Sequence, residues 1–393
     1  MMLRDGDLQA GSDGTARWHS QRLAELVRAE AKANGGAVTF DRFMELALYA
    51  PGLGYYVAGA SKFGRGGDFV TAPTLSPLFG HCLARQCQEV LKALGGGDIL
   101  ELGAGTGDLA ADILDGFKAK GRQPGSYLIL EPSPELRERQ KNLLEQRHPD
   151  LLDSIQWLNG LPQQVRGVVI ANEVMDAQPV HRFQVGAHGE VMELLVRPRA
   201  EGWEEFPDSP RSPGLELAVK ALQAQGLALA PGYTSEVNLR LGPWLAALAG
   251  SLASGLLLLI DYGYDQNDYY RPERVMGTLM CHYRHQAHSN PYINLGLQDI
   301  TAHVDFSSAA RAASQAGLEL AGFCTQAHFL MALGLPEMLE ERLKREPNLN
   351  LLMGAKQLIV PTAMGERFRV LGLTKELSGK WTGFSLRDLR ARL

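Results

Sequence analysis

The sequence predicts an α/β fold in which helices cover both faces of a mostly parallel sheet. Short and almost continuously apolar segments, 98–102, 127–131 and 167–172, alternate with helical segments, as the buried strands of parallel sheets do. A loop of alternate glycines, 103–107, follows the first of these strands and leads into a helix from Leu109 to about Phe117. In open α/β sheets, a glycine loop between strand and helix is a binding place for a nucleotide-like cofactor.

Composition restricts the classes of partner. The chain has 393 residues, of which 45% are hydrophobic and 21% charged, and its net charge is −5. These values are typical of a globular protein with one large or two unequal domains. A net negative charge does not favour binding to nucleic acid, and the apolar run Leu256–Ile260 is far too short to span a membrane.

Cysteine usage and the first residues indicate a reducing compartment. The four cysteines show neither a zinc-binding spacing nor the density of a disulfide scaffold, so we expect buried, reduced thiols. No apolar signal region follows Met1, and Asp5, Asp7 and Asp13 argue against an organelle transit peptide. From this we expect a cytoplasmic location.

Residues 1–95 are expected to form an N-terminal helical cap with a loop over the cofactor. The expected helices are Trp18–Ala33, Asp41–Tyr49 and Phe79–Leu94. Between them, segments 52–56 and 63–69 are rich in glycine with aromatic or charged side chains, which is typical of a loop that folds over a ligand.

The sheet is expected in two halves, residues 96–178 and 251–393, with an α+β insertion or substrate region at 179–250 between them. The first half adds a helix from Pro134 to about Arg147 and a short strand at 155–158. In the insertion, the sequence predicts a hairpin, then a loop from Trp203 to Pro213, and no clear pattern up to Pro231. The remaining expected elements are the hairpin strands 183–185 and 191–196, helices 244–252 and 306–316, and strands 256–261, 318–324 and 368–373.

The glycine loop points to S-adenosylmethionine more than to a dinucleotide. It reads G-x-G-x-G at Gly103, Gly105 and Gly107 after the acid Glu101, whereas pyrophosphate loops usually read G-x-G-x-x-G. The form resembles the first motif of class I S-adenosylmethionine-dependent methyltransferases. A tight turn without a ligand and a nicotinamide-dependent oxidoreductase are the alternatives, and a nicotinamide titration would test the second.

Polar residues follow two further strands. Glu131 ends the strand after the glycine loop, where a carboxylate can accept hydrogen bonds from both ribose hydroxyls. Acids at strand ends are often helix caps instead, but together with the glycine loop the ribose role is favoured. Asn172, Glu173 and Asp176 follow the fourth strand, at the crevice where such sheets bind ligands. An amide can orient a nucleophile and the two acids can neutralise a cation, but Asp176 could also be a helix cap ahead of Ala177.

The segment Cys281–His288 contains three histidines and raises the question of a metal. His282, His285 and His288 could share a helix face only loosely, and catalytic zinc needs three ligands with an open position. Tyr283 beside them favours a loop that contacts substrate, so we expect no metal site. The role of the histidines stays open.

The chain as a whole resembles the MidA family of S-adenosylmethionine-dependent methyltransferases, which includes the protein-arginine methyltransferase that assembles respiratory complex I. The residues that carry this resemblance extend almost from end to end of the chain. They are F-M-E-L-A-L-Y at 43–49, G-x-G-Y-Y at 52–56, G-R-G-G-D-F-V-T at 64–71, L-S-P-L-F-G at 75–80, E-L-G-A-G-T-G at 101–107, L-E-P-S-P at 130–134, N-E-V-M-D-A at 172–177, P-V-H-R-F at 179–183, I-D-Y-G-Y at 260–264, G-T-L-M-C-H-Y-R-H at 277–285, Q-D-I-T-A-H-V-D-F at 298–306 and M-G-E-R-F at 364–368.

The resemblance implies a class I, Rossmann-like methyltransferase with S-adenosyl-L-methionine as cofactor. The acceptor it implies is an arginine of a protein, by kinship a subunit of respiratory complex I type; a small-molecule acceptor or a non-catalytic assembly factor are the alternatives. Met175 and Gln178 depart from the usual leucines. The expected chain is a monomer or homodimer. The cofactor-binding residues expected are Gly67, Asp68, Thr71, Glu101, Gly103, Gly105, Gly107, Glu131 and Asn172, and the catalytic ones Glu173, Asp176 and Asp261.

Overall fold

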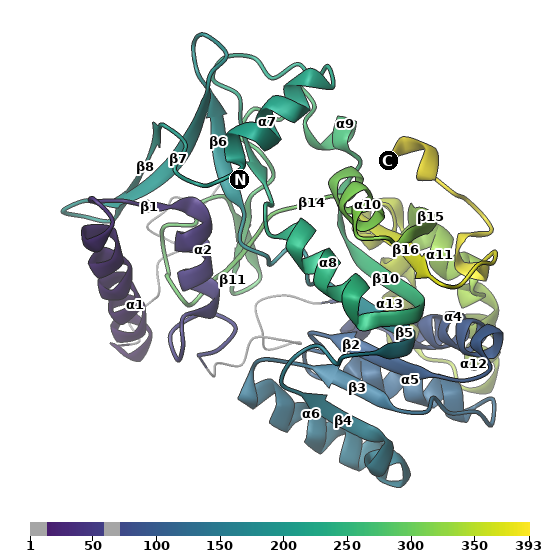
Figure 1. The fold of residues 1–393 in the computed structure, drawn as a ribbon. Coiled ribbons are helices and arrows are strands. Elements are labelled where there is room, and N and C mark those ends of the chain that lie inside the picture. Colours follow the sequence, from purple (N-terminus) through teal and green to yellow (C-terminus); the bar gives the residue numbers. More distant parts are fainter. Residues whose placement is uncertain (1–13, 59–70) are drawn as a thin grey trace. The chain divides into compact units, whose positions relative to one another are not determined.

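The computed structural model describes residues 14–58 and 71–393, which belong to two compact units, each assembled from separate stretches of chain (Figure 1). The first unit comprises Met1–Phe69, Asp176–Leu241 and Asn267–His303. The second comprises Val70–Met175, Gly242–Gln266 and Val304–Leu393. The chain therefore passes from one unit to the other five times.

The second unit is built on an eight-stranded sheet in the order β15-β16-β10-β5-β2-β3-β4, with β14 paired to β10. Neighbouring strands from β4 to β10 are parallel, and β16 runs antiparallel to both β10 and β15. The strands are β2 (Asp98–Leu102), β3 (Tyr127–Leu130), β4 (Ile155–Leu158), β5 (Val165–Asn172), β10 (Leu252–Tyr264), β14 (Val304–Asp305), β15 (Glu319–Thr325) and β16 (Phe368–Lys375).

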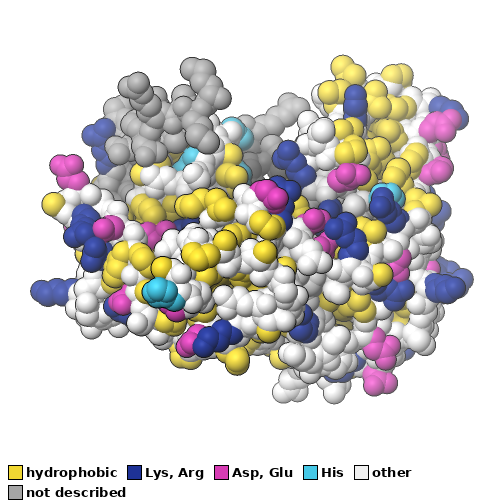
Figure 2. All heavy atoms as spheres, turned by 90° about the horizontal axis from the view of Figure 1, so that it is seen from above, with side chains coloured by type: hydrophobic (Ala, Val, Ile, Leu, Met, Phe, Trp, Pro, Cys, Tyr) yellow, Lys and Arg dark blue, Asp and Glu magenta, His cyan; other side chains and the backbone are white. Residues whose placement is uncertain are grey.

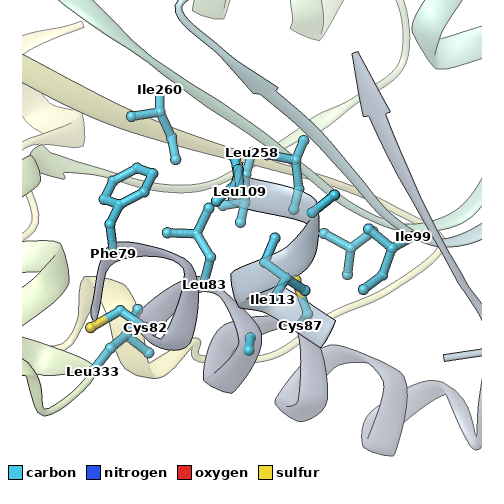
Figure 3. Packing of buried hydrophobic residues seen from close by; sticks show 14 of the residues in the cluster. Phe79, Cys82, Leu83, Cys87, Ile99, Leu109, Ile113, Leu258, Ile260 and Leu333 are labelled. Carbon is cyan, nitrogen blue, oxygen red and sulfur yellow. The ribbon is translucent and has the colours of Figure 1, made fainter. Parts of the chain in front are cut away.

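Apolar side chains from this sheet and its helices form one large core. Ile99, Val168 and Leu256 are register neighbours on one face of β2, β5 and β10, and all three are fully buried. Figure 3 shows Phe79, Leu83 and Cys87 of α4 meeting this face together with Leu109 and Ile113 of α5. The helices of the unit are α3 (Ala72–Leu75), α4 (Leu78–Leu94), α5 (Asp108–Lys118), α6 (Pro134–Arg147), α8 (Leu241–Ser251), α10 (Phe306–Gln315), α11 (Gln326–Ala332), α12 (Leu335–Arg345) and α13 (Leu349–Ile359).

The order of the strands defines where a ligand can bind. From β2 the chain continues to β3 and β4 on one side, and then returns to β5 on the other side of β2. In open α/β sheets, the crevice at the carboxyl ends of strands around such a reversal is the usual ligand site. The glycine loop follows β2 at this position.

The first unit is antiparallel. One sheet has the order β1-β7-β6-β9, with β8 paired to β7, and a second has the order β12-β11-β13. Its elements are α1 (Gly14–Ala33), β1 (Val38–Thr39), α2 (Phe40–Tyr49), β6 (His181–Val185), β7 (Val191–Pro198), β8 (Trp203–Asp208), α7 (Leu215–Ala224), β9 (Thr234–Val237), β11 (Met280–Tyr283), β12 (Gln286–His288) and β13 (Asp299–Thr301), with α9 (Gln266–Tyr269) at the junction.

Ion pairs connect strands within the insertion and join the insertion to α2. The Arg182 guanidinium donates to Glu205, 2.6 Å from Oε2, and lies 3.4 Å from the carboxylate of Glu236, which has no exposed surface. Arg240 donates to Asp41 and to Glu45 of α2, at 2.9 Å in both cases. Because a buried charge is costly without a partner, these contacts fix how α2 lies on the insertion strands.

Most predicted elements are confirmed, including the parallel strands and the hairpin of β6 and β7, within a few residues at their ends. The expected loop 203–213 is wrong in part, because β8 occupies Trp203–Asp208 and pairs with β7. The unpatterned segment before Pro231 contains α7.

The predicted division into domains differs from the two units. Helix α4, expected in the cap, packs on α5 and the sheet of the second unit. The N-terminal helices instead share the first unit with the insertion and with residues 267–303, since β1 pairs with β7.

Charges of both signs are mixed on the face that Figure 2 shows. Lys and Arg side chains are interspersed there with Asp and Glu side chains. Such a surface does not produce the single-sign field that attracts polyanions. Within residues 14–58 and 71–393, no helix combines the length and the apolar character needed to cross a bilayer.

Candidate active site

The glycine loop has a left-handed backbone at each of its alternate glycines. The φ angles of Gly103, Gly105 and Gly107 are 64°, 53° and 92°, a region that side chains with a Cβ rarely occupy. A Cβ added at Gly105 would have no described atom within 4 Å. The loop therefore needs glycine at these positions for its backbone conformation. Gly105 also faces open space, where a ligand can approach the backbone.

Glu131 follows β3 and is 4% exposed. Its Oε1 accepts a hydrogen bond from the Ser133 N–H at 2.9 Å, and its Oε2 accepts one from Gln140 at 3.4 Å. Burial raises the pKa of the Glu131 carboxyl, while these donors and the Gly105 N–H lower it. A carboxylate has about four lone-pair positions, and the donors from Ser133, Gln140 and Gly105 occupy three of them. Glu131 can therefore accept about one further hydrogen bond, such as one from a ribose hydroxyl.

Asn172 is the last residue of β5 and Glu173 follows it; β5 pairs with β2, the strand that leads into the glycine loop. Glu173 is half-buried and has φ 54°, and its N–H donates to the Ile260 carbonyl at 2.9 Å. The Asn172 Nδ2 donates to Glu173 Oε1 at 3.2 Å, while the buried Asn172 Oδ1 has no hydrogen-bond partner among the described residues. A left-handed glutamate and an unpaired buried oxygen are costly features that occur most often at functional sites.

Asp261 lies in β10 next to β5 and has no exposed surface. Its Oδ2 accepts a hydrogen bond from the Met175 N–H and its Oδ1 one from the Tyr262 N–H, each at 2.9 Å. The carboxylate thus holds the backbone just after Glu173. This geometry suits a residue that positions Glu173 better than one that contacts an acceptor.

The predicted cofactor residue Glu101 has its side chain in the core. It is 2% exposed and accepts a hydrogen bond from the Tyr127 hydroxyl at 2.6 Å. Burial raises the pKa of the Glu101 carboxyl to about 7. Its contact with Tyr127 ties β2 to β3 directly before the glycine loop.

The predicted residues of the covering loop are only partly described. Gly67 and Asp68 lie outside the described residues. Thr71 immediately precedes α3, and its carbonyl accepts the N–H and the hydroxyl of Thr74. Since α3 packs against α5, Thr71 belongs to the same unit as the glycine loop.

Asp176 and the three histidines belong to the first unit. Asp176 is 6% exposed, and its carbonyl accepts the Ala302 N–H at 3.0 Å. His282 and His288 lie on β11 and β12, where Cys281 faces His288 in the register; His282, one residue further, points to the opposite face of the hairpin. In the described part of the chain, no group of three or more His, Cys, Asp or Glu side chains could hold a metal ion.

Comparison with known proteins decides the family. The family model described as an S-adenosyl-L-methionine-dependent methyltransferase matches residues 82–324. The chain belongs to this methyltransferase family. The match includes the glycine loop and every strand of the parallel part of the sheet, so the fold class predicted from the sequence is confirmed.

Solved structures and curated relatives agree with this assignment. A Burkholderia thailandensis protein, whose crystal structure holds S-adenosyl-homocysteine, is 38% identical with a TM-score of 0.92, over 98% of this chain and 100% of that one. "Protein arginine methyltransferase NDUFAF7, mitochondrial" of Danio rerio is 29% identical over 85% of this chain and 82% of its own length. The protein of that name from Mus musculus is 31% identical over 86% and 81%.

The cofactor of this methyltransferase is S-adenosylmethionine, and the site residues fit it. The open space at Gly105 is one that a Cβ would fill, Glu131 keeps acceptor capacity for a ribose hydroxyl, and the Asn172 Oδ1 offers an unused acceptor among the described residues. Sequence reasoning missed Gln140, which is fully buried and contacts both Glu131 and the glycine loop.

The expected cytoplasmic location is contradicted, because the curated relatives are named mitochondrial. The expectation rested on acidic residues near the beginning of the sequence. Targeting segments are read by receptors and are often removed, so the composition of a few terminal residues is a weak guide to the compartment in which the fold works.

Proposed function

We propose that this methyltransferase acts on an arginine side chain of a protein. The observation that carries the proposal is Glu173, a half-buried carboxylate in a left-handed conformation at the carboxyl end of β5. The names of the Danio rerio and Mus musculus relatives support arginine as the acceptor. Predicted kinship further favours a subunit of respiratory complex I type.

The chemistry divides between cofactor and protein. When bound, S-adenosylmethionine supplies a methyl group that its sulfonium has already activated. The glycine loop, Glu131 and Asn172 would hold it, and catalysis depends mainly on alignment, because methyl transfer is an in-line displacement.

The acceptor side of the reaction requires a carboxylate. An arginine guanidinium is cationic at neutral pH and has to lose a proton as it is methylated. Glu173 can accept paired hydrogen bonds from the guanidinium, orient one nitrogen and receive that proton. Asn172 orients Glu173 through Oε1, and Asp261 fixes the backbone that follows. Asp176 stays a prediction.

The test uses the purified protein, methyl-labelled S-adenosylmethionine and a lysate from a strain that lacks the gene. We expect label in protein, recovered as methylarginine by mass spectrometry, and loss of the same modification in the deletion strain. Label found only in small molecules would contradict the arginine proposal, and absence of turnover would indicate an assembly factor.

The variant Glu173→Gln sharpens this test. Removing the carboxylate should lower the methylation rate about 10²–10³-fold, the range for loss of one electrostatic contact to the reacting group. Binding of S-adenosyl-homocysteine, measured by calorimetry, should not change. Glu135→Gln is the matched control, since Glu135 is a half-exposed acid of α6 in the same unit. Equal rates for both variants would remove Glu173 from the site.

A further inference from the structure

Gln140 is a polar residue in a position where the helix pattern calls for an apolar one. Helix α6 buries Leu136, Gln140 and Leu144, which follow one another at intervals of four residues. Such a stripe packs on the sheet and is normally apolar. A buried amide in it costs free energy unless its hydrogen bonds are satisfied, so the partners of Gln140 are informative.

These partners satisfy the hydrogen bonds of both the nitrogen and the oxygen of the Gln140 amide. The Nε2 donates to the Gly105 carbonyl at 2.8 Å and to Glu131 Oε2 at 3.4 Å. The Oε1 accepts a hydrogen bond from the Trp157 indole N–H at 2.9 Å. A flipped amide would place its oxygen against the two acceptors and its N–H groups against the indole donor. Trp157 therefore fixes the orientation in which Gln140 faces the site.

The helix also lies unusually close to the glycine loop. A Cβ added at Gly107 would be 3.2 Å from Gln140 Cα and 3.3 Å from its Cγ. Gly107 thus permits the close approach that brings the amide within reach of Gly105. Loop, acid and helix form one connected arrangement across β2, β3 and β4.

We propose that Gln140 is a positioning residue for the cofactor, which sets the spacing between the Gly105 backbone and the Glu131 carboxylate. It acts through these two groups, without contacting the cofactor itself. The proposal depends on S-adenosylmethionine as the cofactor and is independent of the acceptor.

The test is calorimetric titration of the full chain with S-adenosyl-homocysteine. Gln140→Glu keeps the shape and the acceptor for Trp157 but removes both donors, and we expect Kd to rise about 10- to 100-fold, as for loss of a hydrogen bond to a charged group. Trp157→Phe removes only the indole donor that fixes the orientation of the Gln140 amide, and we expect Kd to rise less, by about 3- to 10-fold. Gln146→Glu, the same substitution at an exposed position of α6, is the control and should bind as the parent protein does.

A double variant distinguishes positioning from a general loss of stability. Glu131→Gln with Gln140→Glu exchanges donor and acceptor, so its Kd should be lower than the product of the two single effects predicts. Thermal unfolding without ligand reports the structural contribution separately. The proposal is overturned if Gln140→Glu binds within twofold of the parent, or if the two single effects multiply fully in the double variant.

Discussion

In the second unit, left-handed residues gather at the carboxyl ends of neighbouring parallel strands, whereas the first unit contains a buried arginine that carboxylates neutralise. Gly103, Gly105, Gly107 and Glu173 all have left-handed φ angles where parallel strands end. In the first unit, the buried charge of Arg182 is met by carboxylates. Buried charges that are paired serve the fold, but strain that no packing demands points to a ligand. Four experiments can break or sharpen this contrast.

The largest effect is expected at Gly105. Gly105→Val places a branched side chain in the open space and forces it to φ 53°, so binding of S-adenosyl-homocysteine should be lost in calorimetry. Gly35→Val is the control: Gly35 has φ 76° and open space as well, but belongs to the first unit. We expect both variants to give the circular dichroism spectrum of the parent protein and only Gly105→Val to lose binding. Unchanged affinity in a folded Gly105→Val protein would contradict the assignment of the loop.

Breaking a buried ion pair should give the next largest effect. Arg182→Met leaves the Glu236 carboxylate buried without its cation, which should lower the free energy of unfolding by about 3–5 kcal/mol in urea titrations. Lys220→Met breaks an exposed pair with Glu216 in the same unit and should cost less than about 1 kcal/mol. If both variants lost the same free energy of unfolding, burial would not determine how much these ion pairs contribute to stability.

The buried carboxyl of Glu101 should make the free energy of unfolding depend on pH. Its pKa is raised to about 7 by burial, so the folded state binds its proton more tightly than the unfolded state. The resulting stabilisation is present at low pH and is lost as pH rises through about 7. Between pH 5.5 and 8 this contribution should fall by about 2 kcal/mol.

Glu101→Gln is neutral and should remove that part of the pH dependence, measured by denaturant titration of both proteins at each pH. The same variant tests the predicted contact with cofactor. A large loss of S-adenosyl-homocysteine affinity would assign Glu101 a direct role, whereas unchanged affinity would leave it as a support for β2 and β3.

The smallest effect concerns a hairpin turn of the first unit whose two residues have left-handed φ angles, as the glycine loop of the second unit does. Arg284 and His285 join β11 to β12 with φ 48° and 62°, angles for which two-residue hairpin turns prefer Asn-Gly. Arg284→Asn with His285→Gly should raise the free energy of unfolding by about 0.5–1 kcal/mol. Lower stability would show that the native side chains hold the hairpin; higher stability with reduced methylation would indicate that they are kept for function.

The sequence was informative wherever the signal was local. Continuous apolar strands predicted the parallel sheet, and Glu131 and Asn172 are predicted as site residues because they stand at the carboxyl ends of such strands. Strand β8 was missed, since Trp203–Asp208 contains Pro207 and three acids and resembles a loop. Pairing with β7 stabilises it, and that contact depends on a separate stretch of chain.

Gln140 was missed for a related reason. The charged residues around it make α6 resemble a surface helix, and only the packed structure shows that Gln140 is buried. The two units were also beyond prediction, because the pairs that join their stretches, such as β1 with β7, are distant in sequence. The order of residues along the chain gives no direct sign of such pairs.

The fivefold passage of the chain between units has a consequence for biosynthesis. The first unit cannot be completed until His303 has left the ribosome, and the second needs β16, which ends at Lys375. The contact between Arg240 and Asp41 closes a loop of about two hundred residues, a separation for which closure is slow and entropically costly. Neither unit can therefore finish folding early in translation. Until the later stretches have been made, the incomplete sheets expose unpaired strand edges and apolar surface, which favour aggregation.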